Sequence, residues 1–189
     1  MSKDKELSLA NLENVQTKIT TAEQYKEAGN AYYKNGNYKK AAGQYHRSVL
    51  YMKGIDNDLF GTPDFLKSVS VHPSEKKTKI PEEVEKRCIA INISIYNNLA
   101  ASLLKIEGSE PSKIIHYTDI VLELDPGNSK ALFRKAQAEY QSKDYESAAK
   151  SLKRIPTPDR SVKDLIQKVN SAQKNELQAL KNSYKNMFK

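Results

Sequence analysis

Five polar side chains in this sequence have the types and the spacing expected of a carboxylate-binding site. Lys26 and Asn30 lie four residues apart, as do Lys130 and Arg134, and Asn98 lies between the two pairs in the sequence. Residues four apart share one face of a helix, so each pair would point the same way. Clustered cations repel one another unless an anion joins them, and a carboxylate accepts several charge-assisted hydrogen bonds at once. The five residues therefore predict a site for carboxylates of a partner, provided that helices bring them to one surface.

An internal repeat supplies helices of the required kind. A 34-residue unit starts at Ala22. Two antiparallel helices approach closely only where one of them presents a small residue. Gly29 is such a residue, Tyr45 is a bulky one that would fill the groove between the helices, and Gly36 fits the turn that joins them. The unit is therefore expected to be a helix-turn-helix pair.

Two further units follow, and a last helix ends the chain. The second unit starts near residue 93 and the third at residue 129, with Ala100 and Ala136 at the small position of each. Three such units are enough for a stable stacked array. Residues 160–188 carry apolar residues at helical spacing and are expected to cap the array.

An insertion separates the first unit from the second. Residues 55–81 contain glycine and proline and show no helical period, which predicts a long loop, whereas residues 82–92 read as an early start of the next helix after Pro81. The expected organisation is an N-terminal extension at 1–19, either disordered or a loose helix, and one domain at 20–188. Within the domain we expect repeat 1 at 22–55, the insert at 56–92, repeat 2 at 93–128, repeat 3 at 129–158 and the C-terminal helix at 160–188.

The motifs KEAGN, YNNLAA and KALFR resemble the dicarboxylate clamp of tetratricopeptide repeat domains in cochaperones. The segments YHRSVL and YNNLAASLLK, on either side of the long insert, are similar to the tetratricopeptide repeat protein 9 family. The ending LKNSYKNMF resembles the extra helix of large immunophilins. The resemblance implies an all-α superhelix in which the first helix of each repeat lines the concave surface. It also implies binding of the C-terminal Glu-Glu-Val-Asp tail of the ninety- and seventy-kilodalton heat-shock chaperones. We call Lys26, Asn30, Asn98, Lys130 and Arg134 the clamp residues, because each matches a clamp position of that family.

Two details of this site stay open in the sequence. Asn97 adjoins Asn98, and a shift of the helical register by one residue would exchange their places. The apolar side chain of a bound tail is expected to meet groove positions at Tyr33, Ala101 and Gln137.

Composition argues against several other classes of protein. The chain has 189 residues, a net charge of +8 and one cysteine, Cys88, which excludes a disulfide framework and a multi-cysteine zinc site. The three histidines are scattered, and no glycine-rich phosphate loop is present. We therefore expect a non-enzymatic adaptor that needs no cofactor, metal or small-molecule substrate. The lack of an apolar leader and of a long apolar run predicts a cytoplasmic location, and a nuclear one also fits.

The basic C-terminal segment suggests a second class of function. Residues 150–189 hold ten Lys/Arg and three Asp/Glu, a net charge of +7. This segment could bind anionic nucleic acid or membrane, although it lacks the interleaved aromatic residues of a base-stacking surface. A scaffold for a cytoskeletal partner is a third possibility. Both are less favoured by the sequence than capture of an acidic tail.

Overall fold

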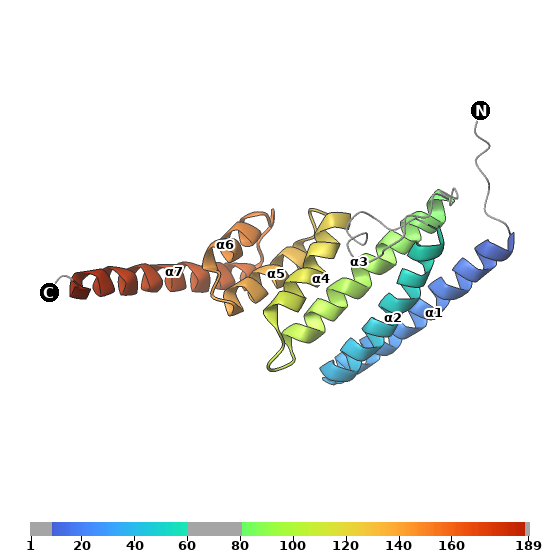
Figure 1. Ribbon diagram of the computed structural model, residues 1–189, viewed down its shortest axis with the longest axis horizontal. Helices are drawn as coiled ribbons and strands as arrows, with labels where there is room; N and C mark the ends of the chain where they lie inside the picture. Colours follow the sequence, from blue (N-terminus) through green and yellow to red (C-terminus); the bar gives the residue numbers. More distant parts are fainter. Residues whose placement is uncertain (1–8, 60–80, 188–189) are drawn as a thin grey trace, which may run out of the picture. The chain divides into compact units, whose positions relative to one another are not determined.

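The computed structural model describes residues 9–59 and 81–187, and in this part of the chain every regular element is an α-helix (Figure 1). The helices are α1 (Leu9–Lys34), α2 (Tyr38–Leu59), α3 (Glu82–Leu104), α4 (Pro111–Leu124), α5 (Ser129–Gln141), α6 (Tyr145–Lys153) and α7 (Arg160–Met187). The chain divides into two compact units, unit 1 ending at Ser102 and unit 2 starting at Leu103.

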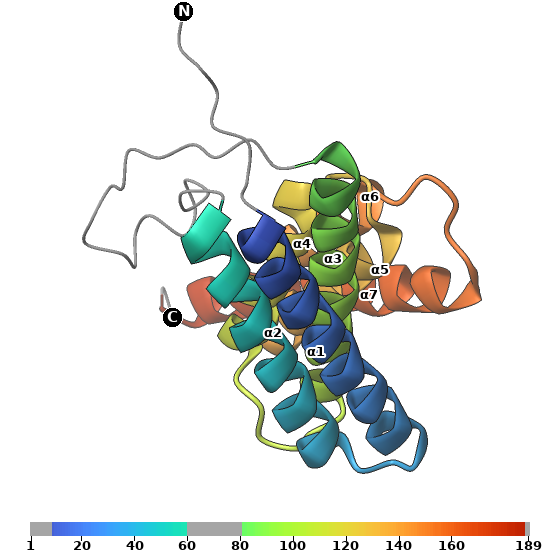
Figure 2. The ribbon, with the colours of Figure 1, turned by 90° about the vertical axis from the view of Figure 1, so that its right-hand side faces the viewer.

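In unit 1, α1 and α2 run side by side as an antiparallel pair (Figure 2). They approach most closely at Gly29, where an added Cβ would lie only 2.5 Å from Cε1 of Tyr45. The Tyr45 side chain is buried against this gap, and Ser48 Oγ donates a hydrogen bond of 2.6 Å to the carbonyl oxygen of Ala22. Gly36 has a φ of +73° in the turn, which is a conformation that glycine adopts without strain. The predicted small-against-large packing of the first repeat is confirmed.

Helix α1 starts earlier than the sequence suggested. Residues 1–19 were expected to be an extension, yet α1 begins at Leu9, and Val15 and Ile19 are buried in unit 1. Lys18 Nζ also donates a hydrogen bond of 3.1 Å to the carbonyl oxygen of Gly54 on α2. The extra turns are therefore held by tertiary contacts as well as by helix propensity. Residues 1–8 lie outside the described part of the chain.

The two ends of the insertion are helical. Helix α2 continues to Leu59, four residues beyond the expected end of repeat 1. Helix α3 begins at Glu82, directly after Pro81, as expected, and the first turn carries Glu82, Glu83 and Glu85. Carboxylates at this end of a helix are favoured by the helix dipole. Residues 60–80, which include most of the predicted loop, lie outside the described residues.

Unit 2 is built from the last four helices, each of which packs on the next in the chain. Asn128 caps α5 by accepting a hydrogen bond from the backbone N–H of Ala131 at 3.0 Å, and Asp144 caps α6 by accepting one from Ser147 at 3.0 Å. These are the favoured capping residues, since their short side chains reach an otherwise unpaired N–H group. The small residue Ala136, as predicted, is fully buried.

Helix α7 changes character along its length. Val162, Leu165 and Val169 are buried in unit 2, which agrees with the predicted capping role of its first half. The second half carries four large apolar side chains that are more than half exposed, namely Leu177, Leu180, Tyr184 and Met187. Among the described residues, no helix has both the length and the apolar character that crossing a membrane requires.

Candidate functional site

Three clamp residues lie in unit 1, and two of them are in direct contact. Asn98 Nδ2 on α3 donates a hydrogen bond of 3.0 Å to Asn30 Oδ1 on α1. Tyr45 Oη on α2 donates to the same Asn30 oxygen at 2.8 Å. Because both bonds use the oxygen of the Asn30 amide, its orientation is fixed. The amide nitrogen is therefore the part of Asn30 that faces other partners.

The structure also decides between the two adjacent asparagines. Asn97 is buried, with a relative exposure of 5%, whereas Asn98 is half-buried and bonded to Asn30. The helical register within unit 1 thus places Asn98, and not Asn97, beside Asn30.

Tyr45 acts as a permanent hydrogen-bond donor in this cluster. Burial, followed by the nearby Tyr33 and Glu27, raises the pKa of the Tyr45 phenol to about 12, and a hydrogen bond with Asn98 opposes the rise. The phenol is thus protonated at neutral pH and can donate to Asn30. From the sequence, Tyr45 was expected to belong to the core of the first repeat, where some of the tyrosines also line the groove. The hydrogen bond from Tyr45 to Asn30 was not predicted. The predicted packing of Tyr45 against Gly29 nevertheless places the ring close to Asn30, the next residue in the chain.

Lys26, the third clamp residue of unit 1, is linked to Asn30 through a carboxylate of the chain itself. Lys26 Nζ lies 3.3 Å from Glu27 Oε1, and Asn30 Nδ2 donates to Glu27 Oε2 at 3.1 Å. The hydrogen bond from Asn30 and then the one from Lys26 lower the pKa of the Glu27 carboxyl. Glu27 is a functional candidate that the sequence reasoning missed. The i,i+3 spacing from Glu27 to Asn30 was the available signal.

The other two clamp residues lie in unit 2, on one face of α5. Lys130 is exposed and Arg134, one turn later, is half-buried. The Asn128 cap fixes the start of this helix just before Lys130. The adjacent Lys135 pairs with α4, since its Nζ lies 2.6 Å from Asp119 Oδ1. That all five clamp residues share one surface stays a prediction.

The three groove positions are accessible to a ligand. Tyr33 and Ala101 in unit 1 and Gln137 in unit 2 are all partly exposed. The Tyr33 ring packs edge-on against Tyr38, with ring centroids 5.1 Å apart. Their contact with a bound tail stays a prediction.

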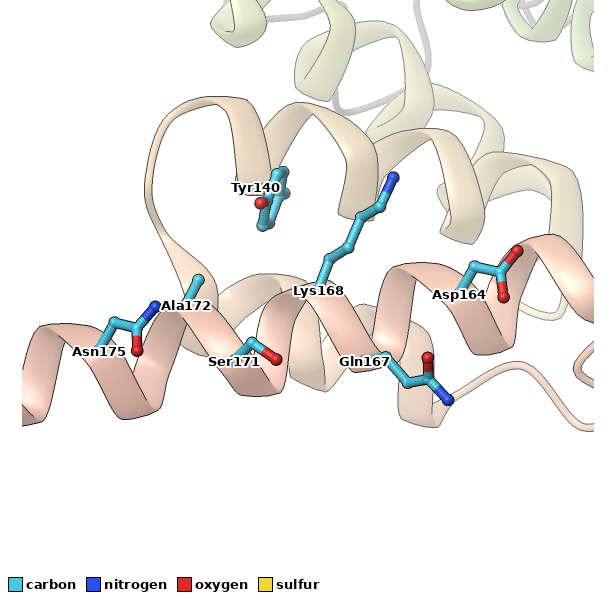
Figure 3. A pocket seen from close by; sticks show the side chains of 7 residues that line it. All are labelled: Tyr140, Asp164, Gln167, Lys168, Ser171, Ala172 and Asn175. Atoms are coloured by element: carbon cyan, nitrogen blue, oxygen red, sulfur yellow. The ribbon is translucent and has the colours of Figure 1, made fainter.

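Unit 2 also contains an open groove between α5 and α7 that the sequence did not reveal (Figure 3). Its volume is about 530 Å³. Figure 3 shows the side chains of Tyr140 and Lys168 reaching into the space between the two helices. The lining is mostly polar and consists of Tyr140, Asp164, Gln167, Lys168, Ser171, Ala172 and Asn175. Tyr140 lies further along α5 than Lys130 and Arg134, so this helix contributes to both the groove and the clamp.

Known proteins resemble this chain over most of its length. No family model matches it. It is 26% identical to tetratricopeptide repeat protein 9C of Xenopus tropicalis over 174 residues, which cover 90% of this chain and 93% of that protein.

Solved structures show the same fold at lower identity. The C-terminal tetratricopeptide-containing domain of a Plasmodium falciparum FK506-binding protein aligns with a TM-score of 0.69 and 19% identity, covering 87% of this chain and 95% of that domain. The first tetratricopeptide domain of Spaghetti (RPAP3), bound to the HSP90 peptide SRMEEVD, aligns with a TM-score of 0.54 and 16% identity, covering 82% and 96%. The predicted fold is confirmed: over the residues that the structure describes, the chain has the all-α fold of tetratricopeptide repeat domains.

Proposed function

We propose that this chain is a non-enzymatic adaptor of the cytoplasm that captures the acidic C-terminal tail of a ninety- or seventy-kilodalton heat-shock chaperone. The observation that carries the proposal is the fixed amide of Asn30. Its oxygen is held by Asn98 and Tyr45, so its nitrogen is presented as a donor next to the ammonium group of Lys26. A group of donors and cations of this kind suits a carboxylate.

The two ends of the clamp would have different tasks. In unit 1, Asn30 and Lys26 would bind one carboxylate of the tail, with Asn98 holding the Asn30 amide in place. In unit 2, Arg134 can grip a second carboxylate through two parallel bonds, while Lys130 adds a point charge. The first tetratricopeptide domain of Spaghetti, which shares the fold, is bound to an HSP90 peptide ending in Glu-Glu-Val-Asp, and this supports a tail of that kind as the ligand. Affinity should be about micromolar, since contacts are few and binding must order a flexible tail.

The proposal is tested by titrating a Glu-Glu-Val-Asp peptide against the wild type and three variants, Asn30→Ala, Lys130→Ala and Arg134→Ala. Each variant should lose roughly tenfold or more in affinity, because a hydrogen bond to a charged group is worth about 1.5–3 kcal/mol. The matched control is Lys39→Ala, which removes an exposed lysine of α2 and should bind like the wild type. Amidation of the peptide's C-terminus should weaken binding as well. Equal affinity of the wild type and all three variants would refute the clamp.

A second candidate function rests on the exposed half of α7. Lys174, Lys181 and Lys185 are exposed and, at helical spacing, lie along one flank of the stripe formed by Leu177, Leu180, Tyr184 and Met187. An apolar stripe flanked by lysines suits an anionic membrane surface, where the apolar side chains enter the interface and the lysines meet the headgroups. A nucleic acid would contact the lysines but would leave the apolar stripe in water. This function does not depend on the clamp residues.

A further inference from the structure

We propose that Glu27 is a built-in competitor that occupies the unit 1 half of the clamp until a ligand carboxylate displaces it. The inference rests on the proposed function and adds to it a residue that sets the affinity and the selectivity of the site. Two contacts carry it, one from Lys26 and one from Asn30, and both end on the same carboxylate.

The geometry of Glu27 is that of a bound ligand. Lys26 Nζ approaches one oxygen at 3.3 Å, and Asn30 Nδ2 donates to the other oxygen at 3.1 Å. These are the two groups of α1 that would bind an incoming carboxylate. The same contacts lower the pKa of the Glu27 carboxyl, first through Asn30 and then through Lys26. Glu27 is therefore charged at neutral pH and competes with a ligand as a carboxylate.

The Glu27 side chain is free to move, whereas its two donors are held in place, so replacing Glu27 by a ligand carboxylate requires little rearrangement. The Glu27 side chain is 66% exposed, while that of Lys26 is only 19% exposed. The Asn30 amide is held through its oxygen by Tyr45 and Asn98, and these bonds do not involve Glu27. Rotation of the Glu27 side chain into water thus opens the site, while its donors stay in place.

The cost of displacement is small but has a consequence for selectivity. An exposed ion pair of this kind contributes little to stability, so Glu27 should weaken binding without preventing it. A ligand with one carboxylate merely replaces Glu27 and gains little. Under the proposed function, a ligand with two carboxylates would in addition engage Lys130 and Arg134. Glu27 would therefore favour doubly acidic tails over single carboxylates.

The test compares Glu27→Gln with Glu23→Gln in the full-length chain. Both variants remove one negative charge from α1, four residues apart, but Glu23 pairs with Arg87, its Oε2 lying 2.7 Å from Arg87 Nη2. Affinity for the Glu-Glu-Val-Asp peptide is measured at low and high salt, and circular dichroism confirms the fold of each variant. Glu27→Gln should bind the peptide roughly two- to fivefold more tightly than the wild type, as removal of an exposed competing pair implies. Its affinity should also depend more steeply on salt, because binding then forms a new ion pair instead of exchanging one.

The outcomes separate this inference from the proposed function. Unchanged or weaker binding by Glu27→Gln, with Asn30→Ala still defective, would overturn the competitor role and leave the clamp intact. An equal gain for Glu23→Gln and Glu27→Gln would also overturn it, because net charge alone would then explain the effect. If the wild type does not bind the peptide, both the clamp and the competitor are refuted.

Discussion

The contact between Gly29 and Tyr45 links the fold to the site, and the substitution Gly29→Ala tests both. A Cβ at position 29 would lie 2.5 Å from Cε1, 2.7 Å from Cδ1 and 2.9 Å from Cζ of the Tyr45 ring. Ordinary carbon contacts are about 3.5–4.0 Å long. The ring is 1% exposed and has no open space to move into without disturbing the core. Alanine at this position should therefore strain the α1–α2 interface.

The magnitude follows from three contributions. Overpacking of a well-packed core costs about 1–3 kcal/mol. A shifted ring also loses the 2.8 Å bond from Tyr45 Oη to Asn30, which costs about 1 kcal/mol. Alanine gains about 1 kcal/mol over glycine inside a helix. The net loss in the free energy of unfolding is about 2 kcal/mol, and for a chain of this size the midpoint should fall by about 4–8 °C.

Thermal and urea unfolding followed by circular dichroism measure this loss, and Gly43→Ala is the matched control. Gly43 lies on α2, is exposed, and has open space where alanine would place its Cβ, with nothing within 4 Å beyond its chain neighbours and the backbone of its own helix. The same substitution there should stabilise the protein by up to about 1 kcal/mol through helix propensity. Opposite signs for the two glycines are expected. A Gly29→Ala protein as stable as the wild type would contradict the packing argument, because the close contact with Tyr45 would then cost no stability.

Two further predictions concern unit 2. Burial raises the pKa of the Glu139 carboxyl, although the hydrogen bond from Ser151 opposes the rise. The buried side chain is therefore more stable protonated than ionised. Its contribution to the free energy of unfolding is fully present below the unfolded pKa near 4.5 and is lost as pH rises through the higher folded pKa. Ser151 Oγ donates to Glu139 Oε2 at 2.8 Å, and Glu139→Gln keeps an acceptor for this bond. The variant should raise the unfolding midpoint at pH 7 more than at pH 4. An equal rise at both pH values would exclude the ionisation of Glu139 as the cause. If α7 binds anionic surfaces, changing Lys174, Lys181 and Lys185 together to Glu should abolish sedimentation with phosphatidylserine vesicles and leave peptide capture intact, whereas retained sedimentation would exclude that function.

The sequence predicts the fold well because the small and large positions of the repeat are local and periodic. Gly29 and Ala136 both fall where a neighbouring helix comes close, and both are buried. The start of α1 was missed because residues before the repeat were judged by the repeat alone. Val15, Ile19 and Ala22 nevertheless follow the i,i+4,i+7 spacing of a buried face, so this signal was present.

The site was predicted less completely, for a physical reason. Residue types and spacing singled out Lys26, Asn30 and Asn98 as candidates, because each lies on a helix of regular periodicity, and their role in binding stays a prediction. Tyr45 was missed since it is 15 residues from Asn30 in sequence and meets it only through helix packing. The Lys26–Glu27 contact was missed because adjacent residues on a helix do not normally face each other. Only the long side chains of these two residues make the contact possible.

Glu27 also provides evidence for the chemistry of the site that does not depend on any resemblance. Both hydrogen bonds to Asn30 Oδ1 consume its acceptor, and the raised pKa of Tyr45 keeps the phenol a donor over the whole neutral range. Asn30 can then offer only N–H groups on its other side, and Lys26 can offer only donors. Donors and positive charge of this kind suit an anion, and in the structure both groups contact a carboxylate of the chain itself, that of Glu27. The proposed preference for carboxylates therefore rests on the contacts within unit 1, and the proposed preference for two of them rests on Lys130 and Arg134. Variants on α5 and on α1 have to be compared in the same titration for this reason.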